Sequence, residues 1–458
     1  MTGPAVRFDP AAATWPALVA NASTNISAEK RLFRQELGLP ADGPIIMSGH
    51  QCAFWHGGIL AKMFAAAALR TAISGAHAAW LWVDQDADET GTLRVPIRDE
   101  RGVLQSRTWQ LKRPPGDEVP ASSAPAFTPE PFVEASRAAL PHVAEGLREM
   151  HTSLTANKSA PSAARQTAAA ASSLLSPLFH DLGGVPIQLF ASAISRTTAW
   201  RELIARIAAD PTRVARTYNE AVRASPPAGV APLAIEPSRV ELPIWKLPPG
   251  HPRSRISSDR LASLDPSHLA PRALLMTGML RWLGCDLFIH GTGGAAYDAI
   301  TERWLRDLLG ITLAPTVMAT ADLTLPIPAP EVSMDQVQRA AWLAHSARHD
   351  PMILHASAFA GEKQSLLAQI NTARERGEHP HDLYKRMHEV LERYRAAHNS
   401  DLDRLDLEAS AIRERLAEST VARDRTWPFP FHARGALESL RDSVFGAILG
   451  TPATPGSR

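Results

Sequence analysis

Short apolar segments alternate with helical patterns along most of the chain. The segment 44–49 (PIIMSG) precedes an Ala-rich helical pattern at 58–73, and 285–291 (CDLFIHG) precedes another helical pattern. Two more apolar segments, 78–84 and 185–190, have a similar length. Repeated strand-then-helix units predict a parallel sheet, and strands that are apolar throughout predict helices on both of its faces. The predicted fold class is therefore α/β.

Two segments rich in Pro, Ser and Gly, 112–130 and 224–256, read as loops or insertions. Residues 139–180 read as helices with an Ala/Ser-rich connection at 159–173. The predicted organisation is a core at 1–360 with insertions near 106–180 and 224–260, coiled-coil helices at 361–422, and a segment at 423–458 that returns to the core.

A different pattern begins at Leu383. Apolar positions there recur every three or four residues, with one extra four-residue step: Leu383, Met387, Val390, Tyr394, His398, Leu402, Leu405, Ala409, Ile412 and Leu416. This spacing predicts a coiled coil with a stutter, although a long amphipathic helix on the core would show a similar pattern. The helical pattern at 362–376 precedes it across a short turn, which favours an antiparallel helical hairpin.

Charge and cysteine content narrow the class of protein. The 48 Lys and Arg residues balance 47 Asp and Glu residues, which argues against nucleic acid or an anionic membrane as the main partner. The two cysteines, Cys52 and Cys285, exclude a disulfide framework and favour a reducing cytoplasm. We expect neither a signal peptide nor a transmembrane helix, because the N-terminus lacks a basic start and the apolar runs are short.

The first candidate site is the turn 49–58 (GHQCAFWHGG), between a predicted strand and a predicted helix. Ligands of parallel sheets bind beyond the carboxyl ends of the strands, and a helix N-terminus there suits a phosphate or carboxylate. His50, Gln51 and His56 would add donors or a proton shuttle. The alternative is that the histidines pack in the interior. Cys52 is open to two readings, a thiolate nucleophile or an unreactive buried thiol.

The second candidate site is "WLWVDQDADET" at 80–90, where Asp84, Asp86 and Asp88 alternate beside Glu89. Carboxylates on one face of a continuing strand could hold Mg²⁺ or orient an amine nucleophile. If a turn begins at Asp84 instead, the carboxylates point in different directions and cap a helix.

The third candidate site is "FIHGTGGAAYD" at 288–298, a strand, a Gly-rich turn and a helix, which is the order that a phosphate-binding turn requires. The segment matches neither the G-x-G-x-x-G nor the Walker A fingerprint. Its interest is that it would lie on the same edge of the sheet as the other two sites.

In this order, the motifs resemble those of the bacillithiol-biosynthesis cysteine-adding enzymes, the BshC family. The matching segments are "GHQCAFWHGG", "VDQDADE", "LAPRALL", "HGTGGAAYD" and "WPFPFHARG". The resemblance implies a Rossmann-like core, a coiled coil that makes a homodimer, and a ligase that joins cysteine to the amine of glucosaminyl-malate. An adenine nucleotide such as ATP is the expected cofactor, while the energy source and any metal stay open.

The resemblance, together with the residues above, gives the candidate site. Catalytic roles are expected for Asp84, Asp86, His50 and Gln51. Substrate or nucleotide binding is expected for Gly49, His56, Gly57, Arg272, Gly291, Gly293, Gly294, Tyr297 and Arg434. Four positions depart from the family motifs: Val83, Gln85, Ala295 and Ala433. Two other functions therefore stay open, a non-catalytic metabolite-binding homologue and an assembly protein that acts through its coiled coil.

Overall fold

The computed structural model describes residues 4–23, 26–86, 91–111, 119–225 and 228–450 and divides into two compact units. The first, here called the core unit, contains residues 1–95, 107–325 and 425–458. The second, the helical unit, contains 96–106 and 326–424. The second segment of the helical unit thus begins at Pro326, earlier than the predicted boundary at 361, because a helix before that boundary packs within this unit.

A six-stranded sheet forms the centre of the core unit, in the order β1-β12-β11-β2-β3-β6. Neighbouring strands from β12 to β6 are parallel, and β1 pairs with β12 antiparallel at one edge. The strands are β1 (Ala5–Asp9), β2 (Ile45–Gln51), β3 (His77–Val83), β6 (Ile187–Phe190), β11 (Leu287–His290) and β12 (Thr316–Asp322). The predicted α/β class with a mostly parallel sheet is confirmed.

The succession of strands reverses direction in the middle of this sheet. The chain runs outward from β2 through β3 to β6, and then returns to the other side of β2 to form β11 and β12. The loops after β2 and β11 therefore diverge from adjacent strands and leave a crevice between them, which is where open α/β sheets bind ligands.

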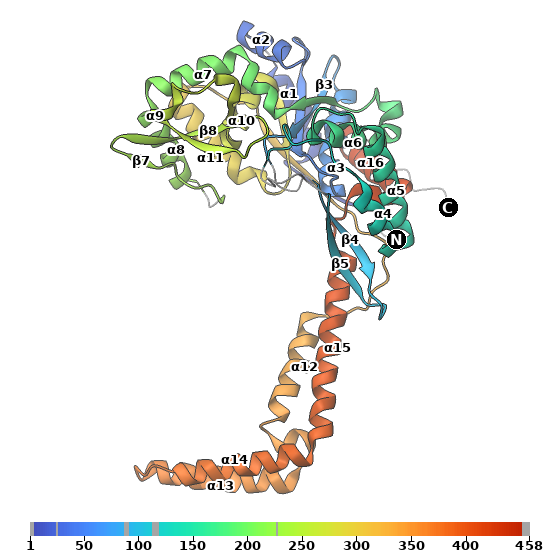
Figure 1. Ribbon diagram of the computed structural model, residues 1–458, viewed down its shortest axis with the longest axis vertical. Coiled ribbons are helices and arrows are strands. Elements are labelled where there is room, and N and C mark those ends of the chain that lie inside the picture. The colour runs from blue at the N-terminus through green and yellow to red at the C-terminus, as the bar shows by residue number, and fades with distance from the viewer. Residues whose placement is uncertain (1–3, 24–25, 87–90, 112–118, 226–227, 451–458) are drawn as a thin grey trace. The chain divides into compact units, whose positions relative to one another are not determined.

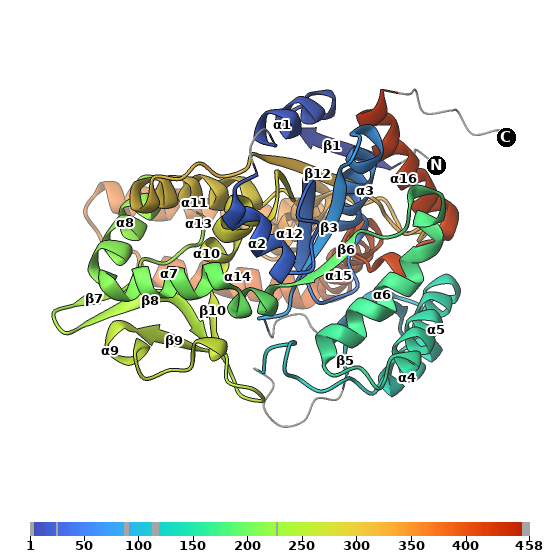
Figure 2. The same ribbon diagram turned by 90° about the horizontal axis from the view of Figure 1, so that it is seen from above.

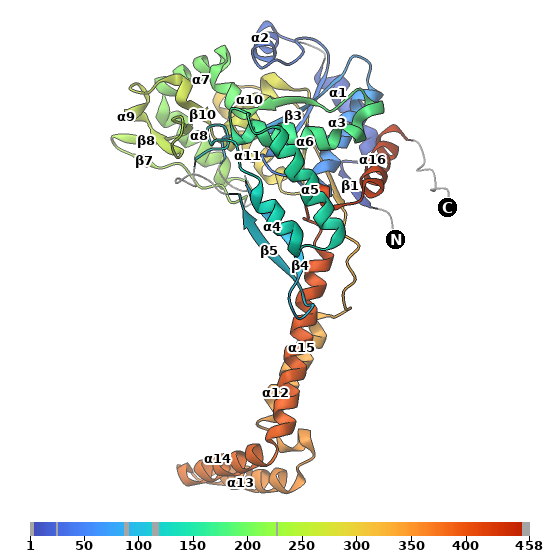
Figure 3. The same ribbon diagram turned by 45° about the vertical axis from the view of Figure 1, so that its right-hand side comes forward.

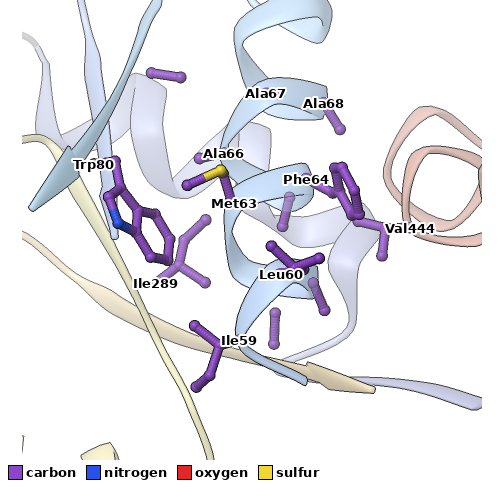
Figure 4. Packing of buried hydrophobic residues seen from close by; sticks show 14 of the residues in the cluster. Ile59, Leu60, Met63, Phe64, Ala66, Ala67, Ala68, Trp80, Ile289 and Val444 are labelled. Atoms are coloured by element: carbon purple, nitrogen blue, oxygen red, sulfur yellow. The ribbon is translucent and has the colours of Figure 1, made fainter. Parts of the chain in front are cut away.

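Helices cover both faces of the sheet, as Figure 2 shows. Along β2, Ile46 packs into one apolar cluster, while Ile45 and Met47 pack into a second cluster on the opposite face. On the first face, α3 (Gly57–Ala72) is buried over nearly its whole length between the sheet and α16 (Arg434–Leu449). Its alanines allow this close packing, and its larger side chains contact Trp80, Ile289 and Val444 (Figure 4).

Within the described ranges, the core unit contains ten further α-helices, some on this sheet and others, such as α4 and α9, on neighbouring helices or the smaller sheet. They are α1 (Trp15–Ala22), α2 (Ala28–Glu36), α4 (Glu130–Ala138), α5 (Pro141–Ala156), α6 (Ala163–Phe179), α7 (Thr198–Ala209), α8 (Pro211–Arg223), α9 (Ser258–Leu261), α10 (Ala273–Met279) and α11 (Gly294–Leu309). Most of the expected Ala/Ser-rich connection at 159–173 is helix α6, because alanine has the highest helix propensity and Ser162 caps the first turn.

A smaller sheet lies largely in the insertion that was expected near 224–260. Its strands are β7 (Ile235–Glu236), β8 (Arg239–Lys246), β9 (Ser254–Ser257) and β10 (Leu269–Pro271), and β8 pairs antiparallel with the other three. A separate hairpin, β4 (Thr92–Arg98) with β5 (Leu104–Gln110), was not predicted.

The helical unit contains two pairs of helices, visible in Figure 1 and Figure 3. In one, α12 (Met334–Ala347) lies beside α15 (Asn399–Arg423); in the other, α13 (Ser357–Glu375) lies beside α14 (His381–Ala397). The predicted pairing of 362–376 with the following helix is therefore present. Within the same unit, Arg101 at the tip of the β4–β5 hairpin forms an ion pair of 2.7 Å with Glu414 on α15.

The predicted continuous seam from Leu383 to Leu416 is wrong in one respect. The helix ends at Ala397, His398 leaves the helical conformation with φ −117° and ψ 25°, and a second helix begins at Asn399. The extra four-residue step in the pattern spans this break. The ten apolar positions of the predicted seam are all buried or half-buried, but they belong to two different helix pairs, α13 with α14 and α12 with α15.

None of the helices in the described ranges is long and apolar enough to cross a bilayer.

Candidate functional site

A cavity of about 440 Å³ lies where the strand order reverses, beyond the carboxyl ends of β2 and β11. We call it the β2–β11 cavity. Its volume is within the range of small-molecule binding sites. It is lined by His50, Gln51, Ile59, Lys62, Ala273, Leu274, Thr277, His290, Gly291, Thr292, Gly293, Gly294, Tyr297, Asp298 and Thr301. Segments from the first and third candidate motifs thus meet at one cavity.

Lys62 is the buried cation of this cavity. It projects from the second turn of α3, is 4% exposed, and donates a hydrogen bond of 2.7 Å to the carbonyl of Gly49. The other two N–H bonds of its ammonium have no hydrogen-bond acceptor among the described residues, although Nζ lies 5.6 Å from the centroid of the Trp80 ring. Burial lowers the pKa of Lys62 from its usual 10.5 to about 7. A lysine in this state would be stabilised by an anion in the cavity.

His50 borders the same cavity from the end of β2. Burial, aided by the nearby Lys62 and His56, lowers its pKa to about 3, against a smaller opposing effect of the Gln51 backbone. Its Nδ1 atom is buried without a well-aligned hydrogen bond in the described part of the chain. His50 is therefore a neutral imidazole near neutral pH, with a nitrogen available to a ligand.

The Gly-rich turn after β11 leads directly into α11. Gly291 and Gly293 have open space where a side chain would begin, and no side chain caps the first turn of α11. The backbone N–H groups of that turn and the helix dipole favour an anion. Gly294 differs, because a Cβ atom there would lie 2.5 Å from the side chain of His290. Tyr297, 39% exposed, borders the opening.

The backbone N–H groups of the turn between β2 and α3 were expected to bind a phosphate or carboxylate, but the structure gives them other contacts. The first turn of α3 is capped internally, since Gly58 N donates to His56 Nδ1 at 3.1 Å. His56 lines a different cavity. Gly49 packs against Leu81, and Gly57 packs against Leu323. The predicted ligand-binding roles of Gly57 and the amides beside it are therefore replaced by packing and capping.

The packing role of Gly57 can be measured. A Cβ atom at this position would lie 2.8 Å from Leu323 Cβ, so Gly57→Ala should lower the free energy of unfolding by about 1–3 kcal/mol in urea denaturation. The matched control is Gly435→Ala in the first turn of α16, where a Cβ atom meets nothing within 4 Å and stability should be unchanged or slightly higher. Equal stability of the two variants would contradict the packing role.

Asp84 and Asp86 lie outside the β2–β11 cavity. A turn begins at Asp84, and its buried carboxylate accepts hydrogen bonds from the backbone N–H, at 2.8 Å, and the hydroxyl of Ser192 in the short 3-10 helix Ala191–Arg196. Burial raises the pKa of Asp84 to about 6. Asp86 forms an ion pair with Arg253. A turn thus begins at Asp84, as in the alternative, but its carboxylate contacts Ser192 instead of capping the next helix, and neither Asp84 nor Asp86 lines the β2–β11 cavity.

Asp88 and Glu89, the other two carboxylates of the second candidate site, lie outside the described residues. Within the described ranges, no three His, Cys, Asp or Glu side chains converge closely enough to hold a metal ion.

The two expected substrate arginines are engaged elsewhere. Arg272 precedes α10, whose Ala273 and Leu274 line the cavity, but its guanidinium pairs with Glu241 at 2.6 Å. Arg434 is on the surface of α16, with its side chain 64% exposed and paired with Glu438. Neither is among the residues that line the β2–β11 cavity.

A second cavity of about 420 Å³ shares His50 and Ile59 with the first. It is mainly apolar, with Phe54, Phe127 and Phe132 in its walls. Cys52 borders it and is buried, and this burial together with Asp84 and Asp86 raises its pKa well above the usual range. The thiolate-nucleophile reading of Cys52 is therefore disfavoured.

Sequence reasoning missed Lys62, His290 and Asp298. Lys62 lies in an otherwise apolar run, "GGILAKMFAAAA" (57–68), on a helix expected to be buried. A lysine within such a run was the signal, because lysine is almost never fully buried without a partner or a function.

Comparisons with known proteins add no family to this description: no protein-family model matches the sequence, and no curated protein proved significantly similar to it.

Proposed function

We propose that this chain is a ligase-like enzyme that binds an anionic small molecule in the β2–β11 cavity. The reaction follows from the resemblance to the BshC family: formation of an amide bond between cysteine, or a similar amino acid, and the amine of an amino-sugar malate conjugate. The proposal depends on Lys62, a buried cation at the wall of the cavity, two of whose N–H donors find no acceptor in the part of the chain that the structure describes; the first turn of α11 lines the same cavity.

The chemistry of the donors supports phosphate or carboxylate as the bound group. Lysine is a common phosphate ligand, and uncapped backbone N–H groups at a helix N-terminus provide further donors. An adenine nucleotide and a malate conjugate both carry such groups. Three residues carried over from the resemblance, Gln51, Gly294 and Tyr297, line the same cavity although they come from distant segments.

The order of the parallel strands supports a Rossmann-like core as the finer description of the fold. Numbered along the chain, the strands β2, β3, β6, β11 and β12 lie in the order 3-2-1-4-5, the order of the first five strands of doubly wound dinucleotide-binding sheets. For the helical unit we keep the proposal of a coiled coil that makes a homodimer.

A second candidate function is a non-catalytic metabolite-binding homologue. Gln85 stands where the family motif has a histidine, and it is buried with its amide nitrogen donating to the carbonyl of Ala191 at 3.1 Å. Because Gln85 makes a structural contact where the family has a histidine, this loop is consistent with a homologue that has lost a catalytic side chain.

Incubation with cysteine, glucosaminyl-malate and ATP distinguishes these functions. We expect mass spectrometry to detect the cysteinyl amide with the wild-type chain and not with Lys62→Met. Binding of the nucleotide or of the malate conjugate by calorimetry, without product from any combination of cysteine, amine and nucleotide, would contradict the ligase proposal and support the second candidate.

A further inference from the structure

Behind the β2–β11 cavity, three charged or titratable side chains form a chain of contacts. Arg281 is 1% exposed; its Nη1 donates to Asp298 Oδ1 at 3.0 Å, and its Nε donates to the carbonyl of Ala314 at 2.9 Å. Asp298, 4% exposed, lies in the second turn of α11 and lines the cavity. Its other oxygen, Oδ2, is 2.6 Å from His290 Nε2.

These contacts give the two ring nitrogens of His290 different roles. Nε2 and Asp298 Oδ2 are both buried, and neither has an aligned hydrogen bond in the described part of the chain, so the 2.6 Å contact between them is the one polar contact that either atom makes there. A carboxylate opposite a ring nitrogen holds the proton on that nitrogen. Nδ1 makes no hydrogen bond within the described residues, and the imidazole borders the cavity at the end of β11. The lone pair of Nδ1 is then the one available to a ligand.

We propose that His290 is a proton acceptor of the β2–β11 cavity, with Asp298 as the residue that fixes its tautomer and Arg281 as the buried countercharge of Asp298. The role of His290 in a reaction rests on the proposed ligase function, whereas its tautomer does not. The motif at 288–298 contains His290 and Asp298, but the sequence analysis did not select them, because the resemblance carried over only the glycines and Tyr297 of this segment.

The proton movement fits amide formation. The amine nitrogen attacks an activated carboxyl carbon, so a C–N bond forms and the C–O bond to the leaving group breaks. The proton leaves the amine nitrogen for Nδ1, and the resulting imidazolium is stabilised by Asp298 opposite Nε2–H. The proton then passes to the leaving-group oxygen, which restores the neutral ring. General base catalysis of this kind typically contributes a factor of about 10²–10⁴ in rate.

The tautomer can be tested without substrate. In ¹⁵N-histidine-labelled protein, with the signal assigned by its loss in His290→Ala, we expect the ring of His290 as the Nε2–H tautomer at pH 8. In Asp298→Asn the side-chain amide can donate to Nε2, and the Nδ1–H tautomer should increase. An Nδ1–H tautomer in the wild-type chain would overturn the proposal.

Activity provides the second test. His290→Ala should lower kcat for amide formation at least about 100-fold, and added imidazole should restore part of the loss, a rescue that a structural role would not show. The control is His180→Ala, because the side chain of His180 is 86% exposed and is not part of the cavity lining. Wild-type kcat in His290→Ala, or a loss that imidazole does not rescue, would refute proton transfer by His290. If the wild-type chain itself forms no product, the ligase proposal fails, and the tautomer alone decides whether His290 is held as proposed.

Discussion

Replacing Lys62 with methionine should weaken the binding of pyrophosphate roughly 10- to 100-fold and abolish product formation, while the core stays folded. The expected loss follows from the geometry: Lys62 is the buried cation at the cavity wall, and within the described ranges only one of its three N–H donors forms a hydrogen bond, to the carbonyl of Gly49. Methionine has a similar length and no charge. The affinity is measured by calorimetry, and Lys158→Met, at an exposed position outside the cavity, serves as the control.

Lys62→Met should also change how the free energy of unfolding depends on pH, and this effect can be measured without a ligand. In the unfolded chain the pKa of Lys62 returns to its ordinary 10.5, whereas burial holds it at about 7 in the folded chain. Between these values the unfolded state binds more protons, so this lysine makes folding more favourable as pH rises, by up to about 1.4 kcal/mol per pH unit. Below pH 7 both states are protonated and its burial destabilises the fold in full.

Lys62→Met should therefore be more stable than the wild-type chain at pH 7, and this advantage should shrink as the pH approaches 10. Urea denaturation at several pH values measures the difference. Parallel pH profiles for the two chains would show that Lys62 is solvated and would remove the reason for treating it as the anchor of the site.

Asp286→Asn should be the most damaging of the conservative substitutions for stability, at about 3–5 kcal/mol. Asp286 is fully buried directly before β11, at the opposite end of this strand from the cavity. Its carboxylate contacts Lys30 Nζ and Arg34 Nη2, each at 2.7 Å, and accepts from the backbone of Ile45 at 2.7 Å. Asparagine retains the size but leaves two buried cations of α2 without their counterion.

The comparison for Asp286→Asn is Asp42→Asn, which removes an exposed ion pair of 2.9 Å with Arg31. That variant should leave the denaturation midpoint almost unchanged, because exposed ion pairs contribute little. If Asp286→Asn is as stable as Asp42→Asn, then α2 is not held to the sheet by buried charge.

The order of elements was predictable because β2, β3, β6 and β11 each contain a short apolar run, and β2 and β11 are followed by helices. The strand β12, "TVMATAD", was missed because its alternating small residues lack a strong apolar run. The helical unit was predicted to begin too late, since the pairing of α12 with α15 joins segments far apart in the sequence. The break at His398 was hidden because the three- and four-residue spacing continues through it.

The site was predictable only in outline. Adjacent parallel strands place the ends of β2 and β11 together, and this much follows from the pattern. Which side chains line the cavity depends on tertiary contacts: Asp84 accepts a hydrogen bond from Ser192, and Arg272 forms an ion pair with Glu241. Lys62 and Asp298 reach the cavity because each projects from a helix one turn beyond the glycine-containing loop, a position that the motif alone does not show.

The central claim is that an anion binds against Lys62, and the pKa of this lysine tests it most directly. In ¹³C-lysine-labelled protein, with the Lys62 signal assigned by its loss in Lys62→Met, the pKa should be about 7 without ligand. Saturating pyrophosphate should raise it by at least about one unit, because a neighbouring anion favours the charged ammonium. A pKa that pyrophosphate leaves unchanged would contradict the account.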